Sequence, residues 1–363
     1  MAAIPTNLRW TRKRLYDGVN NRLRTLGGAR LASLCRPTAI QFLLTERCNA
    51  RCVHCDIWKN RGQEESPTEQ QWAAALTDFR QWLGPVQITL TGGEALLKPF
   101  TIGLVEHGVQ SGLFMELLTH GFWKDQAKIE NLALANPWRV TLSFDGLGST
   151  HDRVRGREGF FDRTNNTINT LVRVRKEHRL GYTIRLKTVI MSYNIGALED
   201  VARYANQDGM EVLFQPIEQN YNTADDPEWY KHSENWPDDP EAAVKAVERL
   251  IQMKHDGFSI ANTVPSLEVM MAYFRDPAAL RVSTQAHSAH EKKASCAALA
   301  LFQVQSNGDV KTCSSMPPVG NIKTQSPREI WKKRPKWWVS GCCMEKRMDE
   351  QEKRQRLTIA GVE

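Results

Sequence analysis

Three cysteines whose spacing suits metal chemistry lie within eight residues of one another, at Cys48, Cys52 and Cys55. They follow directly on a predicted strand, so a single loop presents all three thiols at one end of the fold. A four-iron cluster takes one protein ligand per iron, and three thiolates would leave one iron open to another ligand. A structural zinc site would need a fourth local Cys or His. His54 lies between two of the thiols and is poorly placed to turn inward. The spacing therefore favours an iron–sulfur cluster with one open iron.

The other five cysteines divide into a lone residue and a second group. Cys35 stands alone before the first predicted strand and is interpreted as a free structural thiol. The second group lies in the last fifth of the chain and consists of Cys296, Cys313, Cys342 and Cys343. Because no secretion signal is recognised, these thiols are expected to stay reduced and to serve as metal ligands. Two groups so far apart in the sequence predict two metal sites.

Strand and helix patterns alternate around the first group of cysteines. Between about residues 39 and 216, apolar runs of strand length alternate with helical patterns, which predicts a parallel sheet. The six expected strands are Ile40–Thr45, Gln87–Thr91, Phe114–Thr119, Val140–Phe144, Ile184–Ile190 and Glu211–Pro216. Helices are expected over Ile129–Leu134, Arg163–His178, Leu198–Asn206 and Glu241–Lys254, and after Ser66 as a capping residue. Right-handed crossovers would curl these units into an α/β fold, a partial (β/α)6 TIM-type barrel with its chemistry at the C-terminal ends of the strands.

The C-terminal third has a different pattern. Residues 218–240 are rich in Asp, Glu, Asn, Trp and Pro, which is typical of a long loop or a domain boundary. Asn307-Gly308 between Leu299–Gln305 and Val310–Cys313 predicts a hairpin, and Ser326-Pro327 begins a capped helix. The predicted division is 1–38 as a basic amphipathic helix, 39–217 as the barrel, 218–290 as a connecting region with helices, 291–345 as a small hairpin-plus-helix domain and 346–363 as a charged tail.

Further polar motifs stand at the ends of two predicted strands. Gly92-Gly93-Glu94 ends the second strand, Ser143 and Asp145 end the fourth, and Arg155 follows. Together with the three-cysteine loop, this order resembles the radical S-adenosylmethionine (SAM) enzymes. The resemblance implies a [4Fe–4S] cluster whose open iron binds SAM and cleaves it to methionine and a 5′-deoxyadenosyl radical. It implies that Gly92, Gly93 and Glu94 hold the SAM ammonium, and that Ser143, Asp145 and Arg155 contact the ribose or methionyl end.

The second group of cysteines extends the resemblance. Cys296, Gly308 and Cys313 are spaced like the opening of the SPASM and related twitch domains, in which a hairpin and a helix hold auxiliary clusters. A full SPASM domain has seven cysteines, whereas four remain here, which implies the twitch version with one auxiliary iron–sulfur cluster. Cys342 and Cys343 are adjacent rather than spaced to wrap a cluster. Either both are ligands, or one is a free thiol near the substrate that acts as a hydrogen donor.

The resemblance implies an oxidoreductase that abstracts a hydrogen atom from a polar substrate, giving dehydrogenation or C–C or C–X bond formation. A redox-neutral epimerase is the alternative, and a non-catalytic iron–sulfur electron carrier is an alternative of another class. Only some 38 residues precede the barrel, too few for a separate domain that binds a leader peptide. We therefore expect a sugar-like or other small polar metabolite ahead of a peptide. A reducing donor such as flavodoxin or ferredoxin is implied as a partner.

Composition sets the remaining expectations. The chain has 363 residues with 41% hydrophobic and 25% charged residues and a formal net charge of +7, which indicates a globular protein without a specific nucleic-acid partner. No membrane span or signal peptide is recognised, so a cytoplasmic location is expected. Leu8, Leu15 and Val19 recur at helical spacing among many arginines, which predicts a basic amphipathic helix. That helix either packs on the barrel or contacts an anionic membrane surface or an acidic peptide.

Overall fold

Nine strands form one curved sheet in the computed structural model, which describes residues 6–25, 29–60, 65–224, 226–277, 299–313 and 316–334. The strand order is β6-β5-β4-β3-β2-β1-β7-β8-β9, so β6 and β9 are the two edges of an open barrel. The strands are β1 (Ala39–Leu43), β2 (Gln87–Thr91), β3 (Phe114–Thr119), β4 (Arg139–Ser143), β5 (Thr183–Ile190), β6 (Glu211–Pro216), β7 (Leu301–Val304), β8 (Asp309–Lys311) and β9 (Gly320–Asn321). The predicted partial α/β barrel is confirmed.

Strands β1 to β6 pair in parallel and in sequence order, as the alternating pattern predicts. All six expected strands are present, and their bounds differ from the prediction by at most two residues. In β5, buried and half-buried residues alternate along the strand. Ile184 and Leu186 therefore face the surrounding helices, whereas Arg185 and Lys187 face the barrel interior. This alternation places charged side chains inside the barrel.

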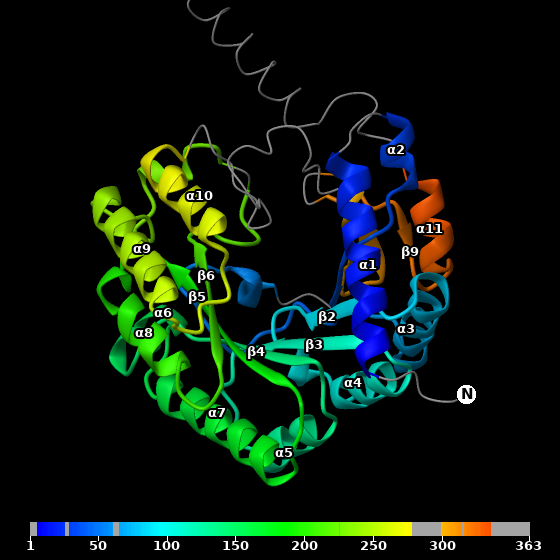
Figure 1. Cartoon of the computed structure of the whole chain (residues 1–363), viewed down its shortest axis with the longest axis horizontal. Helices are drawn as coiled ribbons and strands as arrows, with labels where there is room; N and C mark the ends of the chain where they lie inside the picture. Colours follow the sequence, from blue (N-terminus) through cyan, green and yellow to red (C-terminus); the bar gives the residue numbers. More distant parts are fainter. Residues whose placement is uncertain are drawn as a thin grey trace, which may run out of the picture.

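Helices follow most strands and cover the outer face of the sheet (Figure 1). They are α3 (Glu69–Leu83), α4 (Thr101–Gln110), α5 (Gln126–Leu134), α6 (Ser149–Arg155), α7 (Phe160–Glu177), α8 (Leu198–Ala205), α9 (Pro240–His255) and α10 (Val264–Arg275). Single turns of 3-10 helix occur at η1 (Ile57–Lys59), η2 (Ala95–Leu97), η3 (Ile195–Ala197) and η4 (Trp229–Lys231). The expected cap of α3 was wrong, because Thr68 and not Ser66 accepts a hydrogen bond from the backbone of Gln71.

The predicted hairpin around Asn307-Gly308 is present, with β7 and β8 antiparallel. Strand β7 also pairs in parallel with β1 and so extends the barrel sheet. Phe302 of β7 packs edge-on against Phe79 of α3, with ring centroids 4.9 Å apart. Helix α11 (Pro327–Lys333) has the predicted Ser326 cap. The hairpin thus shares the apolar core of the barrel.

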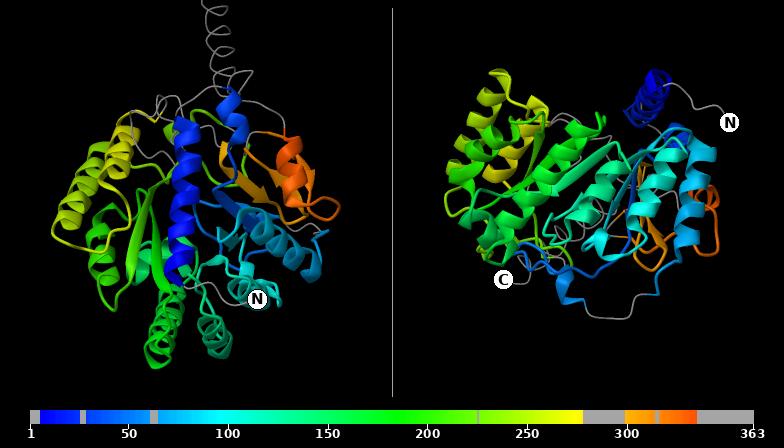
Figure 2. Two further views of the ribbon diagram at one scale, coloured as in Figure 1. Left: turned by 45° about the vertical axis from the view of Figure 1, so that its right-hand side comes forward. Right: turned by 90° about the horizontal axis from the view of Figure 1, so that it is seen from below.

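The basic N-terminal segment forms helix α1 (Thr6–Thr25), which precedes α2 (Ala29–Leu34) and is dark blue in Figure 2. The Trp10 ring lies 4.6 Å from Phe114 and 5.8 Å from Trp138, at the N-terminal ends of β3 and β4. These contacts show that helix α1 packs on the barrel. Leu15 is 67% exposed on its other side.

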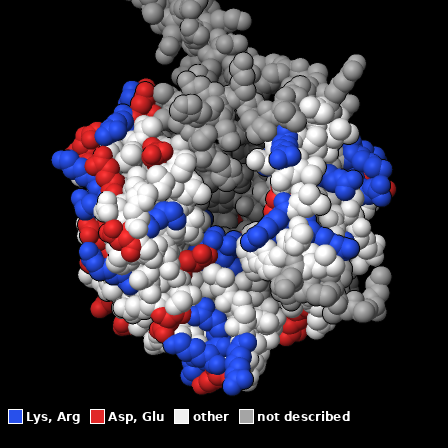
Figure 3. Space-filling view, viewed as in Figure 1, with Lys and Arg blue, Asp and Glu red and all other residues white. Residues whose placement is uncertain are grey.

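Several expectations concern residues outside the described ranges. Cys296, Cys342, Cys343 and the charged tail at 346–363 belong to this group. Cys35 is described, and it is a free thiol that is 1% exposed, as predicted. Among the described residues, no helix is long and apolar enough to cross a membrane. Both signs of charge are distributed over the face shown in Figure 3.

Candidate functional site

The three-cysteine loop leaves the C-terminal end of β1. Cys48, Cys52 and Cys55 are free thiols and are partly buried. Burial raises the pKa of Cys48 to about 12 and also raises the pKa of Cys55, so iron would have to displace their protons. In the described part of the chain, no three Cys, His, Asp or Glu side chains converge on a single-ion site. A cluster places each thiolate on its own iron, so separate thiols on one loop fit a cluster better than a single ion.

The Gly-Gly-Glu turn after β2 packs directly on the backbone of this loop. Gly93 N–H donates to the Thr45 carbonyl at 2.7 Å, and Glu94 N–H donates to the Arg47 carbonyl at 2.9 Å. Gly92 has φ +136°, and a Cβ on it would collide with the carbonyl oxygen of Thr45. Glycine carries no Cβ and therefore permits a close backbone approach. In the structure, the backbone of the Gly-Gly-Glu turn approaches the three-cysteine loop itself.

Helix α6 holds the second half of the loop. Arg51 N–H donates to the Arg155 carbonyl at 3.3 Å, and Val53 N–H donates to the Val154 carbonyl at 3.0 Å. A Cβ on Gly156 would collide with the carbonyl oxygen of Arg51. The loop is thus clamped between the turn after β2 and the end of α6.

A third contact comes from the segments after β6. The side-chain amides of Asn220 and Asn235 both donate to the Val53 carbonyl, at 3.2 and 3.0 Å. Asp56 N–H donates to the Tyr221 carbonyl at 3.0 Å, and a parallel bridge joins Cys55 to Tyr221. Asparagines in the predicted loop at 218–240 therefore help to fix the thiols. Sequence reasoning missed this role because nothing local links Asn220 to Val53.

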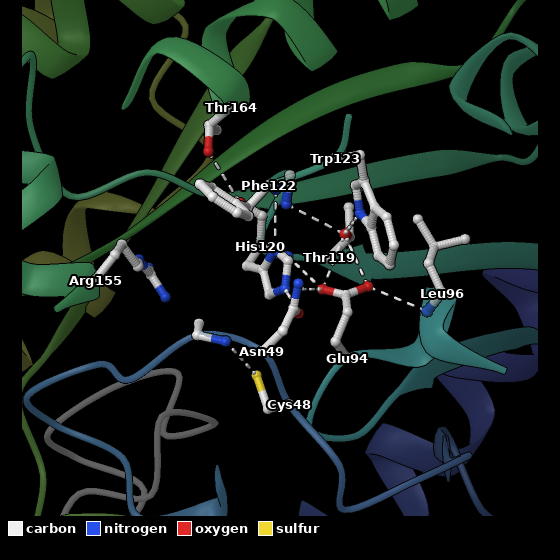
Figure 4. Close-up of polar contacts among 12 residues, drawn as sticks. Cys48, Asn49, Glu94, Leu96, Thr119, His120, Phe122, Trp123, Arg155 and Thr164 are labelled. Atoms are coloured by element: carbon white, nitrogen blue, oxygen red, sulfur yellow. Dashed lines mark hydrogen bonds and ion pairs between the residues drawn. The ribbon is translucent and has the colours of Figure 1, made fainter. Parts of the chain in front are cut away.

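The Glu94 carboxylate is 1% exposed and is surrounded by protein donors (Figure 4). It accepts hydrogen bonds from Leu96 N at 3.1 Å, from the Thr119 hydroxyl at 2.9 Å and from His120 N at 2.9 Å. The His120 ring lies 2.6 Å from the Asn49 amide oxygen and 3.3 Å from Glu94. Burial lowers the pKa of His120, although Glu94 opposes the shift. Glu94 therefore ties the ends of β2 and β3 to each other and to the loop.

We expect Glu94→Gln to weaken SAM binding and to lower the free energy of unfolding by about 1–3 kcal/mol, because the amide nitrogen cannot accept from the donors around it. Equilibrium urea unfolding and SAM titration measure the two effects. Glu106→Gln on the exposed side of α4 is a matched control that should change neither. If Glu94→Gln keeps the wild-type SAM affinity and the wild-type free energy of unfolding, Glu94 neither supports SAM binding nor stabilises the site.

An ion pair joins the end of β4 to the loop. Asp145 is fully buried and pairs with Arg155, and the Arg155 guanidinium donates to Cys52 Sγ at 3.4 Å. Val189 N–H also donates to Asp145 at 3.0 Å. Burial alone would raise the pKa of Asp145, but the Arg155 charge together with His54, His151 and the Val189 N–H outweighs burial, and the pKa is lowered. Asp145 is therefore ionised and holds Arg155 against a predicted cluster ligand.

Sequence reasoning missed two charged groups: Lys187, which faces the barrel interior near this pair, and Glu218, which lies close to Lys187. Lys187 pairs in register with Ser143 across β4 and β5, and burial lowers its pKa. Glu218 follows β6, and burial raises its pKa to about 7 while the Lys187 charge opposes the shift. The signal for Lys187 was present in the sequence. A charged residue at an inward position of a barrel strand needs a polar partner or a ligand.

The structure thus gathers most predicted site residues at the C-terminal ends of the strands, namely Cys48, Cys52, Cys55, Gly92, Gly93, Glu94, Ser143, Asp145 and Arg155. Cys313 lies just after β8, while its predicted partners fall outside the described residues. His54 is half-buried, burial lowers its pKa to about 4, and its Nδ1 has no hydrogen-bond partner among the described residues. The individual roles of these residues stay predictions.

Relatives of known sequence support the pattern. The chain is 26% identical over 303 residues to the AdoMet-dependent heme synthase of Methanosarcina barkeri, covering 81% of this chain and 82% of that protein. It is 28% identical over 182 residues to the PqqA peptide cyclase of Rhodopseudomonas palustris, covering 48% of this chain and 46% of the cyclase. The chain therefore spans less than half of that cyclase.

A solved structure supports the fold. The crystal structure of Streptococcus suis SuiB bound to S-adenosylmethionine matches with a TM-score of 0.63 at 14% identity, over 83% of this chain and 67% of SuiB. The model of the radical SAM superfamily matches residues 42–204, which run from β1 through α8 and contain the three-cysteine loop. The cofactors of this superfamily are a [4Fe–4S] cluster and SAM, as predicted, and SPASM-type relatives carry auxiliary clusters. Residues 42–204 of the chain therefore match a radical SAM domain.

Proposed function

We propose that the chain is an enzyme that abstracts a hydrogen atom from a peptide substrate and yields an oxidised product. The observation that carries the proposal is the three-cysteine loop, clamped by the Gly-Gly-Glu turn, α6 and the Asn220–Asn235 pair at the mouth of the barrel. A cluster and SAM bound there supply a 5′-deoxyadenosyl radical. The thiols of Cys48, Cys52 and Cys55 would hold the cluster, and Arg155 would keep Cys52 oriented.

The barrel interior supplies the polar contacts that a substrate needs. Lys187 faces the barrel interior from β5, Glu218 lies close to it just after β6, and the two carry opposite charges when ionised. We propose that they bind ionic or polar groups of the substrate, so that the reacting carbon is held near the C-terminal ends of β4 and β5. The pKa of Glu218, at about 7, allows it to act as a proton acceptor near neutral pH.

Oxidation of the substrate removes two hydrogen atoms. One is abstracted to give 5′-deoxyadenosine, and the other leaves as a proton and an electron. We propose that thiols from Cys296, Cys313, Cys342 and Cys343 would hold an auxiliary cluster, which would supply an acceptor for this electron. If one of the last two is a free thiol instead, it would return a hydrogen atom, and the reaction would be epimerisation.

We propose a peptide as the substrate in preference to a sugar-like metabolite, whereas the sequence alone favoured the metabolite. Similarity to a peptide cyclase supports the change. A carboxylate-bearing tetrapyrrole is the second candidate, because the similarity to a heme synthase extends over about four-fifths of both chains. Lys187 and Glu218 suit polar groups of either substrate.

The reconstituted protein, SAM and dithionite should be incubated with peptides encoded by short reading frames beside the gene and, separately, with iron–coproporphyrin. We expect a peptide product lighter by two hydrogen atoms, and deuterium in 5′-deoxyadenosine when that peptide is deuterated. Mass spectrometry measures both. Consumption of the tetrapyrrole with no change in any peptide would contradict the peptide proposal and support the second candidate.

A further inference from the structure

Three cations gather around Phe122, in the loop that follows β3. The guanidinium carbons of Arg157 and Arg163 lie 4.6 and 4.4 Å from the centroid of the Phe122 ring, and Lys124 is two residues further along the chain. Lys124 and Arg157 are exposed, and Arg163 is partly buried. Within the described part of the chain, none of the three forms an ion pair. We call these cations, with Phe122 and Trp123, the Phe122 patch.

The patch borders a hollow of about 690 Å³ between α5 and α7. Trp123, Lys124 and Arg163 contribute to its wall, and no Asp or Glu is among the described residues that line it. Lys and Arg side chains are prominent over α5 and α7 on the face shown in Figure 3. Helices α5 and α7 cover the outside of the barrel, so a molecule bound here does not enter the interior that Lys187 faces. An anionic macromolecule is the partner that this surface fits.

One aromatic layer separates the patch from the predicted cluster ligands. The Phe122 ring stacks on Phe160 with centroids 4.6 Å apart. Together with Ala50, these rings form a small apolar cluster, and Cys48 and Cys52 pack against it. A partner seated on the cations would therefore lie across a single aromatic contact from the three-cysteine loop.

A second chain of contacts runs to the same loop. The Trp123 ring stacks on His120 at 5.8 Å with an interplanar angle of 19°. The His120 ring lies 2.6 Å from Asn49, the residue after Cys48. Figure 4 shows the His120 ring between Trp123 and Asn49, with Cys48 beyond Asn49.

We propose that the Phe122 patch is the docking surface for an acidic one-electron carrier protein of the flavodoxin or ferredoxin class. The inference rests on the proposed function, because SAM cleavage consumes one electron. That electron leaves the carrier, which is oxidised, and is accepted at the site held by Cys48, Cys52 and Cys55. Electron-transfer complexes have small interfaces that depend on complementary charge, which suits three unpaired cations around an aromatic pair. Closeness to the loop favours a carrier over an acidic peptide.

The test uses the full-length reconstituted protein with Lys124→Glu, Arg157→Glu and Arg163→Glu combined. The matched control reverses three exposed cations on α9 and α11, Lys245, Arg328 and Lys332, with the same change in net charge. Binding of an acidic flavodoxin and an acidic ferredoxin is titrated at low and high salt. SAM cleavage is then driven either by the reduced carrier or by dithionite, which needs no docking surface.

We expect the patch variant to bind the preferred carrier at least about tenfold more weakly than the control does, with a loss of salt dependence. Its carrier-driven cleavage should fall in the same proportion, while dithionite-driven cleavage stays at the wild-type level. Equal affinity of the patch variant and the control for both carriers would overturn the proposal. The proposal would also be overturned if an acidic polyglutamate peptide bound at this patch and neither carrier did. Failure of the wild type to cleave SAM with dithionite would instead refute the proposed function, and the binding titration would still test the patch.

Discussion

Replacing Cys48, Cys52 and Cys55 together with Ala is expected to abolish formation of 5′-deoxyadenosine. It should also remove about four irons, one cluster, from anaerobically reconstituted protein. The loop offers no other protein thiol, and burial lowers the pKa of the neighbouring His54. Iron bound at the second group of cysteines should remain, so roughly half of the iron of the wild type should survive.

Iron and sulfide analysis together with the electron paramagnetic resonance of the reduced protein measures this outcome. Cys35→Ala is the matched control, because Cys35 is a buried free thiol whose Sγ contacts the Leu31 carbonyl at 3.8 Å, away from the loop. That control should keep all of its iron. Complete loss of iron from the triple variant would contradict the two-site account, and retention of all of it would contradict the role of the loop.

The second large effect is expected at Arg155. Arg155→Met removes the charge that pairs with Asp145 and leaves that carboxylate buried without a counter-ion. Breaking a buried pair in this way costs about 3–5 kcal/mol of unfolding free energy. The variant also loses the hydrogen bond to Cys52 Sγ, so SAM cleavage per cluster should fall with stability.

A double variant separates the two contributions of Arg155. In Arg155→Met with Asp145→Asn, the buried charge is gone, and most of the stability lost in the single variant should return. SAM cleavage should stay low, because nothing replaces the contact to Cys52. Chemical denaturation gives the first quantity and 5′-deoxyadenosine per cluster gives the second. A single variant as stable as the wild type would contradict the pairing.

The barrel strands were predictable because their physics is local. Short runs rich in apolar and β-branched residues between turn signals predict strands, and Gln87–Thr91 and Phe114–Thr119 have the predicted bounds in the structure. The three-cysteine loop was predictable for the same reason, since all of its thiols lie in one short segment. Helix α4 was missed because two glycines interrupt its amphipathic pattern.

Contacts between distant segments were not predictable from one sequence. Strand β7 lies beside β1 although about 260 residues separate Gln41 from Gln303, whose side chains hydrogen-bond at 2.9 Å. Likewise, Asn235 reaches Val53 across the barrel mouth. The sequence also could not show that Glu94 is saturated by Thr119 and the His120 backbone, because Glu94 and Thr119 come from different strand ends.

The most direct test of the account is cleavage of SAM by the protein itself. The protein is reconstituted anaerobically with iron and sulfide, reduced with dithionite and supplied with SAM, and the products are quantified by liquid chromatography. The account predicts 5′-deoxyadenosine and methionine in equal amounts, formed only when Cys48, Cys52 and Cys55 are present. Intact SAM after reduction of protein whose loop holds a complete four-iron cluster would contradict it.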